Sequence, residues 1–231
     1  MTTIVFLPGM MCDARLFAPQ ITALSARHTI SVASVGRFQT MTDLAQDILE
    51  NAPSRFALAG LSMGGILAME VTRLAPERVI GLALMDTNPL AELDAVKAKR
   101  ALQIETVQAG FLRDVMCEQM IPDYLAEGSD AAVLEPLCEE MALALGGDVF
   151  INQSLALRDR PDQTETLKAY TAPALVLCGE EDRLCPIGRH TLMHDLLSNS
   201  TLNILPNAGH LPTLEQPEAT TEALKNWLET L

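Results

Sequence analysis

The first part of the chain alternates short, unbroken apolar runs with stretches in which apolar residues recur every three or four positions. The unbroken runs are typical of strands buried on both faces, and the spaced stretches are typical of amphipathic helices. Strands that alternate with helices indicate a parallel sheet covered on both sides. The expected strands are Thr3–Leu7, Thr29–Ser34, Arg55–Leu61 and Val79–Met85, and the expected helices are Phe17–Ala26, Thr42–Glu50 with Thr42 as N-cap, and Gly64–Leu74.

The pattern changes between residues 90 and 165, where the periodicity predicts helices and no strand. Strand-like runs then return at Ala174–Cys178 and Thr201–Leu205, and Gln216–Leu231 has amphipathic helical spacing. We therefore predict an α/β core formed by residues 1–89 and 166–231, with a mostly parallel sheet of about six strands, interrupted by a helical insertion at 90–165. Its expected helices are Leu93–Gln108, Leu112–Ile121, Ala131–Leu145 and Phe150–Leu157.

Composition limits the classes of function. The 231 residues are 48% apolar, enough for one well-buried core, and the formal net charge is −14. Fifteen acidic and six basic residues fall within 90–165, so the insertion contributes −9. An acidic surface disfavours nucleic acids and anionic membranes as partners. The five cysteines include no C-x-x-C pair, and residues 1–9 read as a first strand rather than a signal peptide, so we expect a cytoplasmic protein with free thiols.

A glycine-rich turn carries the first candidate for chemistry. Gly60-Leu61-Ser62-Met63-Gly64 fits the pattern G-x-S-x-G and lies where an expected strand meets an expected helix. The glycines keep Cβ atoms out of a crowded turn, so the serine hydroxyl projects above the sheet. The helix N-terminus beside it favours a developing negative charge. Ser62 is therefore predicted to be a nucleophile, against the alternative of a turn that binds nothing.

A nucleophilic serine needs a base within hydrogen-bond reach, because the pKa of its own hydroxyl is far too high. His210 follows the expected strand Thr201–Leu205 and can reach Ser62 from the end of the same sheet. The alternative is an ordinary surface histidine. The order of strands and the motif around Ser62 favour His210 as the general base.

The histidine in turn needs an acid that fixes its tautomer and stabilises its protonated form. Asp182 lies a short loop beyond the expected strand Ala174–Cys178 and is the predicted partner. Two rivals remain. Glu181 belongs to the same acidic loop, and Asp86 ends the expected strand Val79–Met85.

Two backbone N–H groups are expected to stabilise the oxyanion of a tetrahedral intermediate. One is that of Met63, directly after the nucleophile, and the other belongs to the loop after the first strand, with Met10 preferred and Met11 as the alternative. These backbone roles leave the methionine side chains free to line an apolar pocket, and Met11 is predicted to contact substrate. The alternative is that they are core residues.

Other candidates are weaker. His190 and His194 have the i, i+4 spacing of a helical metal site, but Thr191 stands where H-E-x-x-H needs its glutamate. Cys12 and Cys185 lie near the expected site without a neighbouring base in sequence. Neither a G-x-G-x-x-G nor a P-loop motif occurs, so we expect no cofactor and no metal.

Taken together, the motifs resemble the α/β-hydrolase superfamily, whose triad order along the chain is serine, acid, histidine. The resemblance implies that residues 90–165 form a cap over the active site. In size and cap the chain is similar to the pimeloyl-carrier-protein methyl ester esterase and to lyase-like enzymes of menaquinone synthesis. Two features depart from the usual pattern: Pro8 replaces a frequent histidine, and the chain begins on the family's third strand. The matching segments are Leu7–Met10, Gly60–Gly65, Ala75–Val79, Gly179–Pro186 and Gly209–His210 with Glu215 and Pro217.

The predicted function is hydrolysis of a small or medium carboxylic ester through an acyl-enzyme. Because the insertion is acidic, a free small molecule with an apolar portion is expected as substrate rather than an acidic carrier protein. The same triad could also serve carbon–carbon bond hydrolysis, acyl transfer or perhydrolysis. A non-catalytic small-molecule receptor is a further alternative, and the sequence does not predict an oligomeric state.

Overall fold

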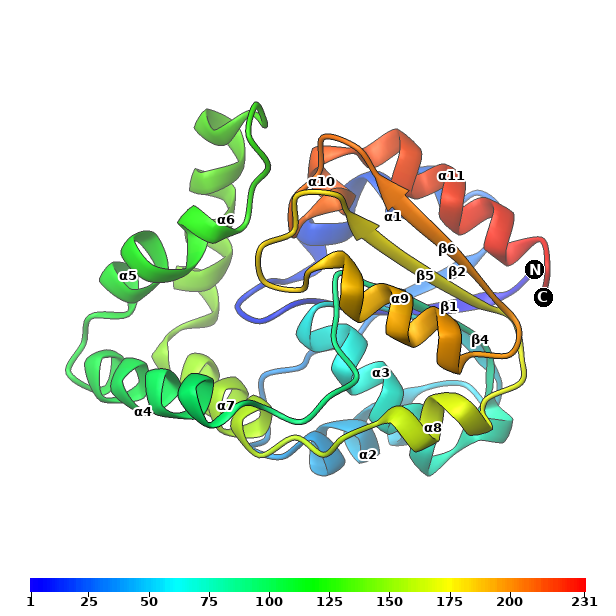
Figure 1. The fold of residues 1–231 in the computed structure, drawn as a ribbon, viewed down its shortest axis with the longest axis horizontal. Coiled ribbons are helices and arrows are strands. Elements are labelled where there is room, and N and C mark those ends of the chain that lie inside the picture. Colours follow the sequence, from blue (N-terminus) through cyan, green and yellow to red (C-terminus); the bar gives the residue numbers. More distant parts are fainter.

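The computed structural model describes all 231 residues and has a six-stranded sheet at its centre (Figure 1). The strands lie in the order β2-β1-β3-β4-β5-β6, and every neighbouring pair is parallel. The predicted α/β fold with about six strands is confirmed, and the sheet is wholly rather than mostly parallel. The strands are β1 (Thr3–Leu7), β2 (Thr29–Val32), β3 (Phe56–Leu61), β4 (Val79–Met85), β5 (Ala174–Gly179) and β6 (Ser200–Leu205).

The strand order reverses its direction at β1. The chain first adds β2 on one side of β1 and then crosses back to place β3 on the other side. In α/β sheets, ligands bind outside the carboxyl ends of the strands at such a reversal. Leu7, the last residue of β1, pairs with Gly60 near the end of β3. The loop after β1 and the turn at Ser62 therefore leave the sheet side by side.

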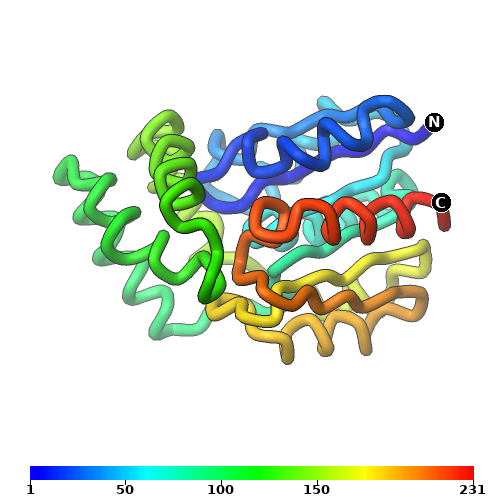
Figure 2. Tube along the Cα trace, turned by 90° about the horizontal axis from the view of Figure 1, so that it is seen from above, coloured from blue at the N-terminus to red at the C-terminus, as the bar shows by residue number.

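Helices cover both faces of the sheet (Figures 1 and 2). The first and last helices of the sheet domain contact each other across one face, and four others pack together on the opposite face. The buried residues of the strands and of these helices form one continuous hydrophobic core. On the first face lie α1 (Ala18–Leu24), α10 (Pro212–Glu215) and α11 (Pro217–Leu228), and on the second lie α2 (Met41–Asn51), α3 (Met63–Leu74), α8 (Thr164–Ala169) and α9 (Ile187–Leu196).

Local chemistry explains where the structure differs from the expected elements. The N-cap of α2 is Thr40 rather than Thr42, because Thr40 has extended backbone and its hydroxyl accepts a hydrogen bond from the N–H of Asp43. Thr42 lies two residues later, inside the first turn of α2, and its hydroxyl donates to the Glu70 carboxylate. Two short helices, α8 and α9, precede and follow β5 and were not expected from the periodicity.

The helices between β4 and α8 lie beyond the carboxyl ends of the strands, on the left in Figure 1. The expected helix Leu112–Ile121 is divided: after one α-helical turn, Met116–Met120 forms a π-helix, a geometry often found at functional sites. We call α4 to α7 the helical segment. Its elements are α4 (Asp94–Gln108), α5 (Leu112–Val115), the π-helical turn, a 3₁₀ turn (Ile121–Asp123), α6 (Ala131–Leu145) and α7 (Gly147–Arg158).

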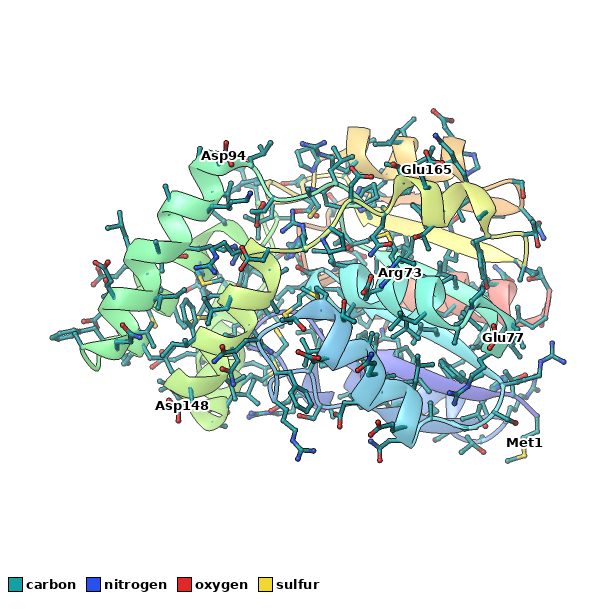
Figure 3. All side chains as sticks on the ribbon, turned by 90° about the horizontal axis from the view of Figure 1, so that it is seen from below. Met1, Arg73, Glu77, Asp94, Asp148 and Glu165 are labelled. Carbon is teal, nitrogen blue, oxygen red and sulfur yellow. The ribbon has the colours of Figure 1, made fainter.

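Most acidic side chains of the helical segment are exposed. Asp94 is fully exposed, and in Figure 3 both Asp94 and Asp148 lie at the periphery of the molecule. Glu165, at the start of α8, is also exposed.

None of the helices has the length and apolar character that crossing a membrane requires.

Candidate active site

Ser62 lies in the tight turn between β3 and α3. Its backbone φ of +55° belongs to a region that disfavours side chains, and the turn depends on glycine at two nearby positions. A Cβ atom at Gly64 would collide with the carbonyl of Leu7, and one at Gly60 would collide with the backbone of Gly64. The hydroxyl of Thr87 donates to the Ser62 carbonyl at 2.7 Å. The turn thus holds the Ser62 hydroxyl above the edge of the sheet.

His210 lies in the loop after β6, and its Nε2 is 2.8 Å from Ser62 Oγ. The backbone of this loop is held on two sides. The N–H of His210 donates to the carbonyl of Tyr124 at 2.7 Å, and the Glu215 carboxylate accepts from the N–H groups of Gly209 and Leu211. His210 is only 4% exposed, so its ring is positioned by the protein rather than by solvent.

Glu215 was known from the sequence only as part of a matching motif, and the structure shows what it contacts. Besides the histidine loop, its carboxylate accepts from the N–H of Ala126 and the hydroxyl of Ser129, both at 2.7 Å. Ala126 and Ser129 belong to the loop before α6. One carboxylate therefore joins the helical segment to the loop that carries His210.

Asp182 contacts the opposite nitrogen of the histidine. Its two carboxylate oxygens lie 3.0 and 2.9 Å from His210 Nδ1, and one of them also accepts from the N–H groups of Leu184 and Cys185. Burial opposes ionisation, but His210 and the two N–H groups outweigh it and lower the pKa of Asp182 to about 2. An ionised Asp182 can only accept hydrogen bonds, so Nδ1 carries the histidine proton and Nε2 is free to accept from Ser62.

The two rival acids lie elsewhere. Glu181 accepts from the N–H of Glu127 at 2.9 Å. Asp86 is completely buried, and one of its oxygens accepts from the N–H of Gly179 at 2.9 Å. Burial, and then the nearby charge of Asp182, raise the pKa of Asp86 well above its usual range. Asp86 therefore bonds to the Gly179 N–H, whereas Asp182 is the carboxylate that contacts His210.

The expected oxyanion donors differ in their availability. The N–H of Met63 begins α3, and the N–H of Met10 follows Gly9 in the loop after β1; neither has an acceptor within the protein. The N–H of Met11 donates instead to Gln153 Oε1 at 2.9 Å. Met10 is thus the better donor of the two alternatives.

Met11, which was predicted to contact substrate, is not among the residues that line the cavity over Ser62. Its side chain is 1% exposed and packs in the core. Met10 and Met63 line the cavity over Ser62. Periodicity could not assign the three methionines to core and pocket, because the loop after β1 has no regular period.

A cavity of about 370 Å³ opens over Ser62 and His210. Sheet-side loops form one wall, and residues of the helical segment and its two junctions form the other. Half of the lining residues are hydrophobic, and the ionisable side chains besides His210 are four basic and two acidic. The cavity is therefore locally more basic than a chain with net charge −14 suggests. Its charged residues are Glu92, Lys99, Arg100, Asp123, Arg160 and Arg189.

The remaining candidates have other partners. Nε2 of His190 accepts from the N–H of Thr87, whereas Nδ1 of His194 contacts Ser200, so the two histidines do not share a site. Burial raises the pKa of both Cys12 and Cys185, which makes each a poor thiolate. Possible metal-ligand atoms of Asp182, Cys185 and His210 lie within 4.8 Å of one another. Asp182 and His210 are hydrogen-bonded to each other, however.

Residues 4–223 match the Alpha/beta hydrolase family, and the chain belongs to this family. It is therefore an α/β-fold hydrolase. The pimeloyl-[acyl-carrier protein] methyl ester esterase of Pectobacterium carotovorum is 26% identical, over 96% of this chain and 92% of the relative. A Bacillus subtilis protein, provisionally named 2-succinyl-6-hydroxy-2,4-cyclohexadiene-1-carboxylate synthase, is 25% identical over 98% of this chain and 85% of its own length.

Solved structures have the same fold. An esterase from Thermogutta terrifontis, determined with malate bound, has a TM-score of 0.91 and 26% sequence identity, and the match covers 99% of this chain and 90% of the esterase. The enol-lactonase from Burkholderia xenovorans has a TM-score of 0.84 at 20% identity, covering 99% of this chain and 91% of the other. The superposition with the Thermogutta esterase includes the helical segment as well as the sheet, because nearly the whole chain is covered.

Proposed function

We propose that the protein hydrolyses a small or medium carboxylic ester through an acyl-enzyme, with Ser62, His210 and Asp182 as catalytic triad. The continuous hydrogen-bond chain from Asp182 through His210 to Ser62 Oγ is the observation that carries this proposal. The unpartnered N–H groups of Met10 and Met63 support it, because a tetrahedral intermediate needs donors for its oxyanion.

The proposed reaction has two stages. His210 Nε2 takes the proton of the Ser62 hydroxyl while Oγ attacks the ester carbonyl, and Asp182 stabilises the resulting imidazolium. The oxyanion accepts hydrogen bonds from Met10 and Met63 until the alcohol leaves with the proton from His210. His210 then removes a proton from water, the hydroxide attacks the acyl-enzyme, and the acid is released as Ser62 Oγ takes the proton from His210.

The cavity supports a small-molecule substrate with an apolar portion. A volume of about 370 Å³ with a half-hydrophobic lining fits a compact ester. Two of the compared proteins are named as esterases, one of them determined with malate bound. A second candidate is a reaction other than ester hydrolysis at the same triad, because one relative is named as a synthase.

The first test is whole-protein mass spectrometry after incubation with a fluorophosphonate. We expect one adduct on the wild-type protein, mapped to Ser62, and no adduct on Ser62→Ala. Ser129→Ala is the matched control. It removes a partly buried serine hydroxyl that donates to Glu215, and the variant should still be labelled. Turnover of methyl and aryl esters by Ser62→Ala should fall by roughly 10⁴- to 10⁶-fold.

Two results would contradict the proposal. One is near-normal ester turnover by Ser62→Ala. The other is a folded wild-type protein that neither reacts with the probe nor hydrolyses any ester of a graded series. This second result would favour a small-molecule receptor, and a ligand released unchanged after tight binding would identify it.

A further inference from the structure

A buried cluster of three charged side chains forms part of the cavity wall opposite Ser62. Glu92 precedes α4, Arg100 lies on α4, and Arg160 follows α7. Their side chains are 6%, 15% and 5% exposed, respectively. Glu92 accepts from Arg160 at 2.6 and 3.0 Å and from Arg100 Nε at 3.1 Å. One carboxylate is thus shared by two guanidinium groups.

Arg160 donates four hydrogen bonds to protein acceptors, through all three of its guanidinium nitrogens. It donates twice to Glu92, and its remaining contacts are the backbone carbonyls of Leu90 and Leu157. These bonds join the two points where the chain enters and leaves the helical segment. The pair of Arg160 and Glu92 is therefore a structural link that needs no ligand.

Arg100 has spare hydrogen-bonding capacity. Nε donates to Glu92, Nη1 meets only the weakly accepting Sδ of Met10 at 3.6 Å, and Nη2 has no acceptor in the protein. Met10 is also the residue whose N–H is available to the oxyanion. The free edge of the Arg100 guanidinium therefore lies in the cavity, one side chain away from the reacting carbonyl group.

The charge of the cluster is not balanced. With Arg160 matched by Glu92, one positive charge remains on Arg100, and a largely buried charge is stabilised by an opposite charge beside it. Burial and then the neighbouring Arg160 act to lower the pKa of Arg100, while Glu92 acts to raise it, and a guanidinium stays charged at any physiological pH. A bound anion would balance the positive charge of Arg100 and accept hydrogen bonds from its Nη1 and Nη2 groups.

We propose that Arg100 binds a carboxylate of the substrate, so that the ester hydrolysed at Ser62 carries a carboxylate in the same molecule. This inference rests on the proposed function, because it assigns the substrate class of that site. A single carboxylate fits better than a phosphate dianion, because the cluster has one unmatched charge and a guanidinium edge pairs with a carboxylate in a planar, two-bond geometry. The acidic outer surface of the helical segment is not in conflict, since Asp94 and Asp148 lie at the periphery of the molecule (Figure 3) and do not line the cavity.

The wild-type protein provides a test without any substitution. Hydrolysis of monomethyl adipate is compared with that of dimethyl adipate in a pH-stat, which places the carboxylate on the acyl side. The hexanoyl ester of glycolate is compared with its methyl ester, which places the carboxylate on the alcohol side. We expect at least about tenfold higher kcat/KM for the charged ester in one of the two pairs. Equal or lower values in both pairs would overturn the proposal.

Variants then assign the preference to a residue. Arg100→Gln keeps polar length without charge and should lower kcat/KM for the preferred charged ester about 10- to 100-fold more than for its neutral partner. Arg100→Lys should recover part of this selectivity. The control is Arg113→Gln, which removes a 65% exposed arginine of the same segment outside the cavity and should leave both substrates unchanged. An equal loss on charged and neutral esters in folded Arg100→Gln would contradict the proposal.

Binding separates this inference from the proposed hydrolysis. Calorimetry with Ser62→Ala measures affinity for the same four esters without turnover. Tighter binding of a charged ester, lost in Ser62→Ala/Arg100→Gln, would support the carboxylate site even if the wild-type protein hydrolysed none of them. Hydrolysis of all four esters with no difference in affinity or rate would retain the triad and reject the carboxylate site.

Discussion

The two walls of the cavity are built in different ways. On the sheet wall, Ser62, Asp182 and His210 each follow a strand directly, and strand register brings the strand ends together. On the helical wall, Glu92 and Arg160 lie 68 residues apart and meet only because the chain returns to the same point. Reaction chemistry is thus encoded in short motifs, whereas substrate selection depends on contacts that no short motif contains.

The two walls also differ in how completely their buried charged groups are paired. The sheet wall pairs the buried carboxylate of Asp182 with His210, and burial lowers the pKa of His190 to about 4. The helical wall leaves the positive charge of Arg100 without a full partner. An incompletely balanced group is expected where a ligand supplies the missing partner, so we propose that substrate binds on the helical wall and reacts on the sheet wall.

The largest effect should come from removing the acid on the sheet wall. Asp182→Asn keeps the shape of the side chain but no longer selects the histidine tautomer, and kcat should fall by about 10⁴-fold. Asp86→Asn is the matched control, because Asp86 bonds to the Gly179 N–H and not to His210, and its kcat should stay within a few fold of wild type. Steady-state kinetics on one ester measures both; a greater loss in Asp86→Asn would reverse the assignment of the acid.

The neutrality of the sheet wall can be measured through stability. Burial lowers the pKa of His190 to about 4, whereas an exposed histidine titrates near 6.5. Between these values the unfolded chain binds a proton that the folded protein does not, so this group reduces stability by about 3 kcal/mol as pH falls from 6.5 to 4. Above pH 6.5 the effect is absent.

The variant His190→Gln should remove this component, because the glutamine oxygen can accept from the Thr87 N–H and does not titrate. Urea unfolding at pH 7, 5.5 and 4.5 gives the comparison. We expect a shallower decline for the variant than for the wild-type protein. Parallel declines would show that His190 does not titrate as its burial predicts.

A smaller effect should come from a contact that crosses between the walls. Gln153, on α7, accepts from the Met11 N–H and donates to the carbonyl of Val35 at 3.2 Å, which fixes the loop that carries Met10. Gln153→Ala should lower kcat about tenfold with little change in KM, because the oxyanion donor is less well positioned. Asn152→Ala, which removes the neighbouring amide bonded to the Gly36 carbonyl, should retain kcat. A change confined to KM would place Gln153 in substrate binding instead.

The sequence predicted the parallel sheet because each buried strand is an unbroken apolar run between turn residues. It also predicted that Ser62, Asp182 and His210 would meet, because each lies just beyond such a run. Their catalytic roles stay predictions until they are tested. The sequence could not show that the side chain of Met11 is buried in the core, because the loop after β1 has no regular period.

The net charge of residues 90–165 was a second limit on what the sequence could predict about the ligand. Summed over residues 90–165, the excess of acidic residues suggested no preference for an anionic ligand, and the cavity-facing arginines were hidden in that sum. The exposed acids lie on the outer faces of the helices, whereas Arg100 and Arg160 face inward. Helical periodicity shows which residues share a face, but only the tertiary arrangement shows which face lines a cavity.

The positive φ at Ser62 places the stability of the fold and the reactivity of the serine in opposition. A side chain in this backbone region costs on the order of 1–3 kcal/mol, and the surrounding glycines and the Thr87 contact maintain it. Glycine at position 62 would relieve the cost and remove the hydroxyl at the same time. The most stable version of this fold is therefore not the reactive one, and selection for stability alone would erode the residue on which the proposed chemistry depends.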